Sequence, residues 1–244
     1  MGIRYEANPP KILPDVDTDK SIEKFVDRIK TISKKCDGIH LTENVLGHKR
    51  VSPITIAEII KKEIPNIPIT VSLRVRDKNE GEIEKFVDKC IAIGVTGILV
   101  LMGDPAQSKT PDSGLIPSLV VSNLKNKKYD SRIELYLSIS NKPNFIKIGK
   151  KIKANPKGFM TQVVQNIKQV QNLSDNLKQF SIIPIILFPS EKNQKSADFL
   201  GLNLIEYSKE FDKFVKETYK ITGDILITSP NDFNGLKEYL ENYY

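Results

Sequence analysis

The chain has 244 residues, of which 39% are hydrophobic and 7% aromatic, and this composition suits one large domain with a full core. Its 37 Lys and Arg outnumber its 30 Asp and Glu, which gives a formal net charge of +7. No apolar run reaches about 18 residues, and the N-terminus leads straight into a predicted strand, so neither a membrane span nor a signal peptide is expected. We therefore expect a cytoplasmic protein.

The positive charge is spread along predicted helices rather than gathered in one block. Lysine pairs recur at residues 34–35, 61–62, 127–128 and 150–151, and Trp is absent. No run interleaves basic and aromatic residues, so solvated helix faces explain most of this charge better than a nucleic-acid surface does. A basic chain also attracts anionic substrates such as phosphates or polyglutamates.

Short apolar runs alternate with longer segments of helical period, which is typical of βαβ units and a parallel sheet. Strands are expected at residues 3–8, 38–43, 69–75, 97–102, 133–140, 158–164, 182–188 and 224–228. Helical segments are expected at residues 21–36, 53–63, 83–91, 117–124, 144–153, 167–180, 196–220 with a break at Gly201, and 233–243. Eight strands, each followed by a helical segment, predict a single (β/α)8 TIM barrel over residues 1–244.

The first predicted strand carries one carboxylate, Glu6, close to its end. Pro9 lacks an N–H and Pro10 restrains the residue before it, so this strand must end near Asn8. In a parallel barrel the carboxyl ends of the strands face the active site. Glu6 is therefore a candidate catalytic residue, although the local sequence also allows a solvated side chain paired with a nearby Lys or Arg.

Polar groups occur at the other predicted strands as well. Asp104 follows a glycine after a long apolar run, and Gln162 lies inside the apolar run of residues 158–164. Asp104 could instead start a turn, as Asp-Pro pairs do, and Gln162, as a buried amide, would need partners such as a loop backbone. His40 alternates with apolar neighbours and is expected to be a barrel residue with satisfied hydrogen bonds.

Sequence motifs for metal and nucleotide sites are missing. Cys36 and Cys90 fit no ligand or disulfide spacing, and no cluster of Asp, His and Glu has metal spacing, so no metal is expected. The chain has no G-x-S-x-G, Walker or G-x-G-x-x-G motif, which disfavours a nucleophilic triad and a Rossmann site. We expect the two cysteines to be buried thiols in a reducing cytosol.

Six segments, each at its own predicted strand, resemble the methylenetetrahydrofolate reductase family over nearly the whole chain. Residues 5–11 resemble the family's F-E-x-x-P-P-K, and residues 41–44 with 50–52 resemble its second-strand segment. The other four are residues 76–79, similar to R-D-x-N, residues 99–105, similar to L-x-G-D-P, residues 158–162, similar to G-A-x-x-x-T-Q, and residues 183–189, similar to I-P-G-I-L-P.

The resemblance implies a flavin enzyme of one-carbon metabolism and methionine biosynthesis. NADH or NADPH would pass a hydride to FAD, with FMN as an alternative, and the flavin would reduce methylenetetrahydrofolate, or a modified methylene-tetrahydropterin, to the methyl form. Glu6 matches the family's general acid, which would protonate the pterin N10, and Asp104 matches an aspartate near flavin and pterin. Gln162 matches a substrate-binding glutamine, and Thr42 and Lys151 match flavin-contacting positions.

Several positions depart from the family pattern, mainly on the flavin side. Met102 stands where many members carry Arg, and Ser72 stands where a His often occurs. Residues 139–143 replace a Tyr-Pro-x-x-His segment, Ile185 replaces a Gly, and the region between the last two strands is short. Because charged contacts to a phosphate are lost, we expect weak flavin binding.

These departures keep a second hypothesis open, a pterin-binding or accessory subunit of the same fold without independent flavin binding. A homo-oligomer or a partner subunit is compatible with either hypothesis, whereas no nucleic acid or membrane is expected as a partner. A third hypothesis, a basic nucleic-acid-binding protein, would require binding with steep salt dependence.

Overall fold

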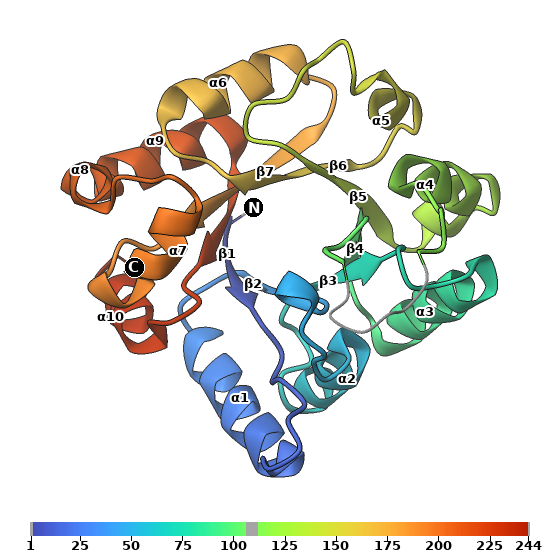
Figure 1. Ribbon diagram of the computed structural model, residues 1–244, viewed down its shortest axis with the longest axis horizontal. Coiled ribbons are helices and arrows are strands. Elements are labelled where there is room, and N and C mark those ends of the chain that lie inside the picture. The colour runs from blue at the N-terminus through green and yellow to red at the C-terminus, as the bar shows by residue number, and fades with distance from the viewer. Residues whose placement is uncertain (1, 106–111, 244) are drawn as a thin grey trace.

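Parallel strands close into a barrel surrounded by helices in the computed structural model, which describes residues 2–105 and 112–243 (Figure 1). Residues 106–111, in the loop expected after Asp104, lie outside the described residues. Within the described residues there are eight strands, paired in chain order from β1 to β8, and β8 pairs with β1. The predicted single (β/α)8 TIM barrel is confirmed.

The elements follow the order that the sequence predicts. The strands are β1 (Gly2–Ala7), β2 (Gly38–Leu41), β3 (Ile69–Arg74), β4 (Gly97–Leu101), β5 (Glu134–Ile139), β6 (Gly158–Val163), β7 (Ser181–Leu187) and β8 (Asp224–Thr228). The helices are α1 (Thr18–Ile32), α2 (Pro53–Glu63), α3 (Glu80–Ile93), α4 (Pro117–Asn126), α5 (Gly149–Lys153), α6 (Ile167–Asn176), α7 (Gln194–Phe199), α8 (Leu204–Lys209), α9 (Phe211–Thr222) and α10 (Phe233–Tyr243). Three short 3-10 turns are η1 (Val45–Gly47), η2 (Tyr129–Ser131) and η3 (Glu191–Asn193).

Capping side chains explain where the helices begin. Ser52 caps α2 and Pro53 is its first residue, as predicted. Helix α1 begins three residues earlier than expected because Asp17 accepts a hydrogen bond from the Lys20 N–H at 3.1 Å, and it ends earlier, at Ile32, with Ser33 as its C-cap. Helix α5 is shorter than expected because the Asn144 side chain accepts the N–H groups of the next turn and holds residues 144–147 outside the helix.

The largest part of the core lies between strands and helices, and separate smaller parts lie inside the barrel and under α7 and α8. Inside, a small apolar cluster fills the middle, formed by Leu99, Tyr136, Met160, Ile183 and Leu226. Below it, at the amino ends of the strands, Arg4 donates to Asp224, from Nε to Oδ1 at 2.9 Å and to Oδ2 at 3.1 Å, and from Nη2 to Oδ2 at 2.6 Å. This pair joins β1 to β8 across 220 residues of sequence.

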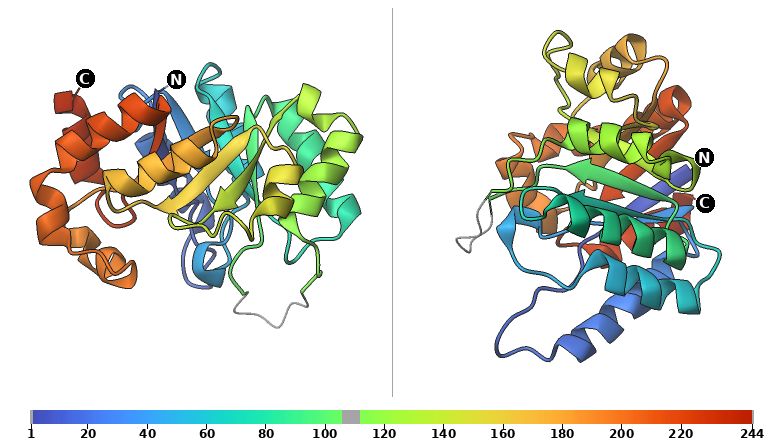
Figure 2. Two further views of the ribbon diagram at one scale, coloured as in Figure 1. Left: turned by 90° about the horizontal axis from the view of Figure 1, so that it is seen from above. Right: turned by 90° about the vertical axis from the view of Figure 1, so that its right-hand side faces the viewer.

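The two ends of the chain lie at the same end of the barrel, opposite to the carboxyl ends of the strands (Figure 2). Figure 1 therefore looks onto the carboxyl ends. None of the helices in the described part of the chain is both long and apolar enough to cross a membrane.

The cysteines are both free. Cys90 is buried as expected, whereas Cys36 is only half-buried because it follows the end of α1. Burial raises the pKa of each thiol to about 12, which makes both unreactive near neutral pH.

Removal of one partner of the Arg4–Asp224 pair is expected to destabilise the barrel strongly. In Asp224→Ala the partly buried guanidinium loses the carboxylate with which it forms an ion pair, and the free energy of unfolding should fall by about 3 kcal/mol. Urea denaturation at neutral pH measures this loss.

Glu206→Ala is the matched control, because the Lys209–Glu206 pair has the same 2.6 Å distance on side chains that are 61% and 64% exposed. Its loss should stay below about 1 kcal/mol. Equal losses in the two variants would mean that water screens the Arg4 pair as well.

Candidate active site

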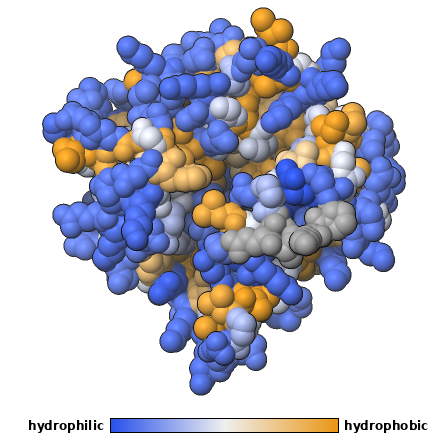
Figure 3. Space-filling model, in the orientation of Figure 1, coloured by the Kyte–Doolittle hydropathy of each residue, from blue (hydrophilic) through white to orange (hydrophobic). Residues whose placement is uncertain are grey.

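The carboxyl ends of the strands surround a cavity of about 570 Å³, a size typical of ligand sites. Residues from seven strands and from α7 line it. The structure brings Glu6, Asp104, Gln162 and Thr42 together in this lining, although they lie far apart in the sequence. Figure 3 views this face of the molecule, where apolar side chains are scattered among hydrophilic ones.

Glu6 lies on β1 between His40 of β2 and Thr228 of β8, its partners in the two neighbouring strands. Burial raises the pKa of Glu6, and a hydrogen bond from the Thr228 hydroxyl offsets only part of this rise. The carboxyl group therefore keeps its proton to a higher pH than an exposed glutamate does. Such a group can donate a proton to a ligand in the cavity.

His40 is the polar neighbour of Glu6 in the barrel wall, and it is 1% exposed. Its Nδ1 lies 2.9 Å from Thr70 Oγ1, and its Nε2 lies 3.0 Å from Ser72 Oγ. Burial lowers the pKa of His40 to about 3, with a smaller contribution from the charge of Arg4. The imidazole is thus neutral and satisfied, as the sequence predicts.

Arg74, at the end of β3, ties three loops of the cavity together and is 1% exposed. Its Nη1 donates to the Asn44 carbonyl and its Nη2 to the Asp104 carbonyl, both at 2.9 Å. The Arg74 main-chain N–H donates to Glu43 Oε2 at 2.7 Å, and the other oxygen of Glu43 accepts Lys78 Nζ at 2.7 Å. These bonds fix the loops that follow β2, β3 and β4.

Asp104 faces the cavity and also holds the loop after β2. Its side chain is exposed, and Oδ2 accepts the Leu46 N–H at 3.0 Å. That loop contains two non-glycine residues with positive φ, Asn44 at 45° and Leu46 at 56°. Such residues are uncommon and occur where surrounding contacts impose them, here the contacts of Asp104 and Arg74.

Gln162 is placed by an irregularity in β6. The pairing of β6 with β7 shifts its register between Met160 and Val163, and the Ile185 N–H donates to the Thr161 hydroxyl at 3.0 Å instead of to a strand carbonyl. This bulge turns Gln162 into the cavity, where its side chain is exposed. The expectation of a buried amide is therefore wrong.

The two predicted flavin-contacting residues have different surroundings. Thr42 is 6% exposed, and its hydroxyl donates to Asn8 Oδ1 at 2.7 Å in the cavity wall. Lys151 is half-buried, donates from Nζ to the Ser138 carbonyl at 2.6 Å, and is not among the residues that line the cavity. Burial lowers the pKa of Lys151.

Two cavity residues were missed by the sequence interpretation. Phe199, at the end of α7, is 79% exposed and lines the cavity. Lys142, in the loop after β5, is an exposed cation in the same lining. Phe199 could have been noticed because it is an aromatic residue two positions before the predicted helix break at Gly201. Nothing in the sequence distinguishes Lys142 from the other lysines.

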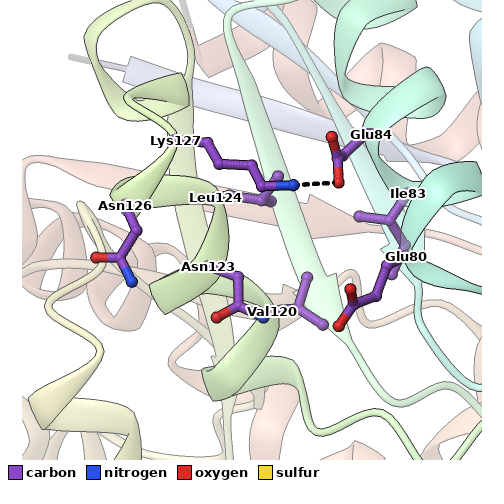
Figure 4. A pocket seen from close by; sticks show the side chains of 8 residues that line it. All are labelled: Glu80, Ile83, Glu84, Val120, Asn123, Leu124, Asn126 and Lys127. Atoms are coloured by element: carbon purple, nitrogen blue, oxygen red, sulfur yellow. Dashed lines mark hydrogen bonds and ion pairs between the residues drawn. The ribbon is translucent and has the colours of Figure 1, made fainter.

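Another cavity, of about 290 Å³, lies between α3 and α4 on the outside of the barrel (Figure 4). Its polar contact is a surface ion pair, in which Lys127 Nζ lies 2.6 Å from Glu84 Oε1. None of the strand-end residues lines it. No group of three or more His, Cys, Asp and Glu side chains could hold a metal ion in the part of the chain that the structure describes.

Comparison with protein families gives one match over most of the chain. A family model described as methylenetetrahydrofolate reductase matches residues 2–191. The matched range covers β1 to β7 and ends before α7. No curated protein sequence matches this chain.

Several solved structures share the fold. An uncharacterized protein from Clostridium thermocellum that binds two copies of 5-methyl-5,6,7,8-tetrahydrofolic acid is 17% identical, with a TM-score of 0.68 over 98% of this chain and 91% of that one. The GH18 chitinase ChiB from Flavobacterium johnsoniae is 12% identical, with a TM-score of 0.57 over 93% and 86%. Tryptophan synthase from Pyrococcus furiosus is 10% identical, with a TM-score of 0.57 over 99% and 95%. At such identities the likeness concerns the fold alone.

Gly103 is expected to be indispensable for the loop contacts of Arg74. Its φ is +82°, and an added Cβ would lie 2.9 Å from Cγ and Nε of Arg74. Gly103→Ala should therefore combine the cost of a left-handed backbone with the displacement of the guanidinium, about 3 kcal/mol of unfolding free energy in all. Urea denaturation measures it.

Gly114→Ala isolates the backbone contribution, since Gly114 has a φ of +71° and no atom within 4 Å of the added Cβ. Its cost should be about 1–2 kcal/mol. If Gly103→Ala and Gly114→Ala lose the same free energy of unfolding, Arg74 moves aside freely and does not fix the loops.

Proposed function

This chain belongs to the methylenetetrahydrofolate reductase family, and on that premise we propose that it reduces methylenetetrahydrofolate, or a related methylene-tetrahydropterin, to the methyl form. Reduced nicotinamide, NADH or NADPH, is the proposed source of the hydride. The observation that carries the proposal is Glu6, a carboxyl group with a raised pKa in the lining of a ligand-sized cavity. The Clostridium thermocellum protein of the same fold binds the corresponding methyl product, which supports a folate as ligand.

Glu6 acts as the general acid in this proposal. Protonation of the pterin N10 by Glu6 breaks the bond between N10 and the methylene carbon and leaves a cationic iminium at N5. A hydride then adds to the methylene carbon to give the methyl group, and the proton stays on N10. Neutral His40 beside Glu6 places no positive charge there, so the acid form is retained until the substrate accepts the proton.

Three further residues suit the substrate. The exposed Asp104 carboxylate faces the cavity, where a negative charge stabilises the cationic iminium. The Gln162 amide makes no hydrogen bond to the described residues in the structure and can donate to and accept from the pterin ring. The exposed ring of Phe199 offers a surface against which the aminobenzoyl ring of a folate can pack.

The cavity fits a pterin better than it fits a tightly held FAD. Among the described residues that line the cavity, Arg74 and Lys142 are the cations. Both Nη atoms of Arg74 donate to main-chain carbonyls, and its buried Nε, which has no hydrogen-bond partner, is covered by Gly103. Within the described part of the chain this leaves Lys142 for a diphosphate, because Lys151 donates to the Ser138 carbonyl. We therefore derive no step through a flavin and expect its affinity to be weak.

The same shortage of cations favours a second candidate function, a pterin-binding or accessory subunit that acts with a partner protein. Such a subunit would bind the pterin in the cavity without reducing it alone. Binding of 5-methyltetrahydrofolate without any turnover of the methylene form, whichever nicotinamide or flavin is supplied, would identify this function.

Glu6→Gln should lower the rate of methylene reduction by about 10²- to 10⁴-fold, because an amide cannot supply the proton to N10. The rate is measured with NADH and NADPH, each with and without added FAD or FMN. Glu58→Gln, in a surface pair with Lys62, is the control and should leave the rate unchanged.

The same variant should be more heat-stable than the native chain at pH 8. The pKa of Glu6 is higher in the folded chain than in the unfolded chain, so the folded chain loses stability as the pH rises through the folded-state pKa. Glutamine does not ionise, so the variant does not lose this stability. Thermal denaturation should therefore show a melting-temperature gain at pH 8 that shrinks toward pH 4. A pH-independent difference would mean that Glu6 is not buried as a neutral acid.

Met102→Arg should strengthen FAD binding by about ten- to a hundredfold, the usual value of one charge-assisted hydrogen bond to a phosphate. Flavin fluorescence titrations with FAD and FMN measure the affinities, and the uncharged Met102→Gln is the control. A tight, stoichiometric FAD complex of the native chain would show that other residues hold the phosphates.

A further inference from the structure

Besides the cavity at the carboxyl ends of the strands, a smaller cavity of about 220 Å³ also reaches Glu6. Its walls come from β1, α1, η3 and the segment that joins β8 to α10, and we call it the β8 cavity. Glu6 is the one described residue that lines both this cavity and the larger one. Residues 192–234, which supply half of its walls, lie beyond the range that the family model matches, so this feature is not covered by the family match.

The β8 cavity contains an arginine without a carboxylate partner. Arg28 of α1 is exposed and forms no ion pair with the described residues. Its guanidinium carbon lies 5.7 Å from the centre of the Phe233 ring, and that ring meets the ring of Tyr5 at 6.3 Å between centroids. An arginine stacked on a packed aromatic ring is held in place before a ligand arrives.

The one other carboxylate in the cavity besides Glu6, within the described chain, is already neutralised. Asp232 accepts Lys192 Nζ at 2.9 Å and the Gly235 N–H at 3.2 Å in the first turn of α10. Burial opposes the charged form of Asp232, but these hydrogen bonds hold its pKa below the ordinary value. The positive charge of Arg28 is therefore the charge in the β8 cavity that no ion pair with a described residue balances.

Neutral donors complete the walls. Asn8 accepts the Thr42 hydroxyl at its Oδ1, which leaves the amide hydrogens of Asn8 for a ligand in the β8 cavity. Helix α10 begins at Phe233 in the same wall, but the Asp232 carboxylate already caps its first turn. The guanidinium of Arg28 and the amide of Asn8 together suit an oxyanion.

From these contacts we propose that the β8 cavity is an anion subsite, in which Arg28 binds a carboxylate or phosphate group beside Glu6. This inference deepens the proposed function and rests on it for the identity of the ligand. Two sources carry such a group, the glutamate tail of a folate and the phosphates of the nicotinamide dinucleotide. The loops after the seventh and eighth strands of (β/α)8 barrels often bind phosphate, which agrees with this position.

Isothermal titration calorimetry at fixed ionic strength tests the subsite without turnover. The probes are inorganic phosphate, NADH, and 5-methyltetrahydrofolate with one and with three glutamates. Arg28→Gln should lower the affinity for phosphate, and for at least one of the larger probes, by about ten- to a hundredfold. Arg28→Lys keeps the charge and should restore part of the affinity.

Lys24→Gln is the matched control, because Lys24 lies one turn earlier on the exposed side of α1, does not line the cavity and carries the same charge. A selective loss for NADH assigns the subsite to the dinucleotide, and a loss that grows with glutamate number assigns it to the folate tail. Phosphate binding that depends on Arg28, without affinity for pterin or NADH, would support the subsite while refuting the proposed function. Equal effects of the two variants, or no effect of Arg28→Gln on any probe, would overturn the inference.

Discussion

The cavity depends on one buried guanidinium. Arg74 is placed where no water can solvate it, so its two Nη groups must find acceptors, and they find the carbonyls of Asn44 and Asp104. Both acceptors lie in loops with positive φ, and Gly103 is there because only glycine leaves space for the guanidinium. The position of the Asp104 carboxylate at the cavity is thus a consequence of how Arg74 satisfies its hydrogen bonds.

The neighbouring strands present only uncharged polar groups to Glu6, whose partners there are His40 of β2 and Thr228 of β8. The hydroxyls of Thr70 and Ser72 occupy both nitrogens of His40, and burial keeps the imidazole neutral. Thr228 supplies a hydrogen bond from the neighbouring strand β8. A carboxyl group that burial desolvates, and whose partners in the barrel wall are neutral dipoles, retains its proton to a higher pH, as the proposed general acid requires.

Much of the fold could be predicted from the sequence, because strand ends are marked by local signals. The pattern of β8 and α10 predicts the observed bounds, and Ser52 with Pro53 marks the start of α2. The surroundings of Gln162 could not be predicted, since a bulge depends on how two strands pair. The β8 cavity could not be predicted either, because Arg28 and the residues around it come from distant segments. The predicted roles of the cavity residues remain predictions.

Barrel closure itself creates the environment of the proposed acid. Glu6 lies on β1, and Thr228 of β8 and the segment between β8 and α10 form part of its surroundings. Before β8 pairs with β1, a glutamate at this position has water on that side and an ordinary acidity. The Arg4–Asp224 pair joins the same two strands at their amino ends. Closure of the chain on itself and the raised pKa of the carboxyl group are therefore linked, which explains why the local sequence alone also allows a solvated Glu6.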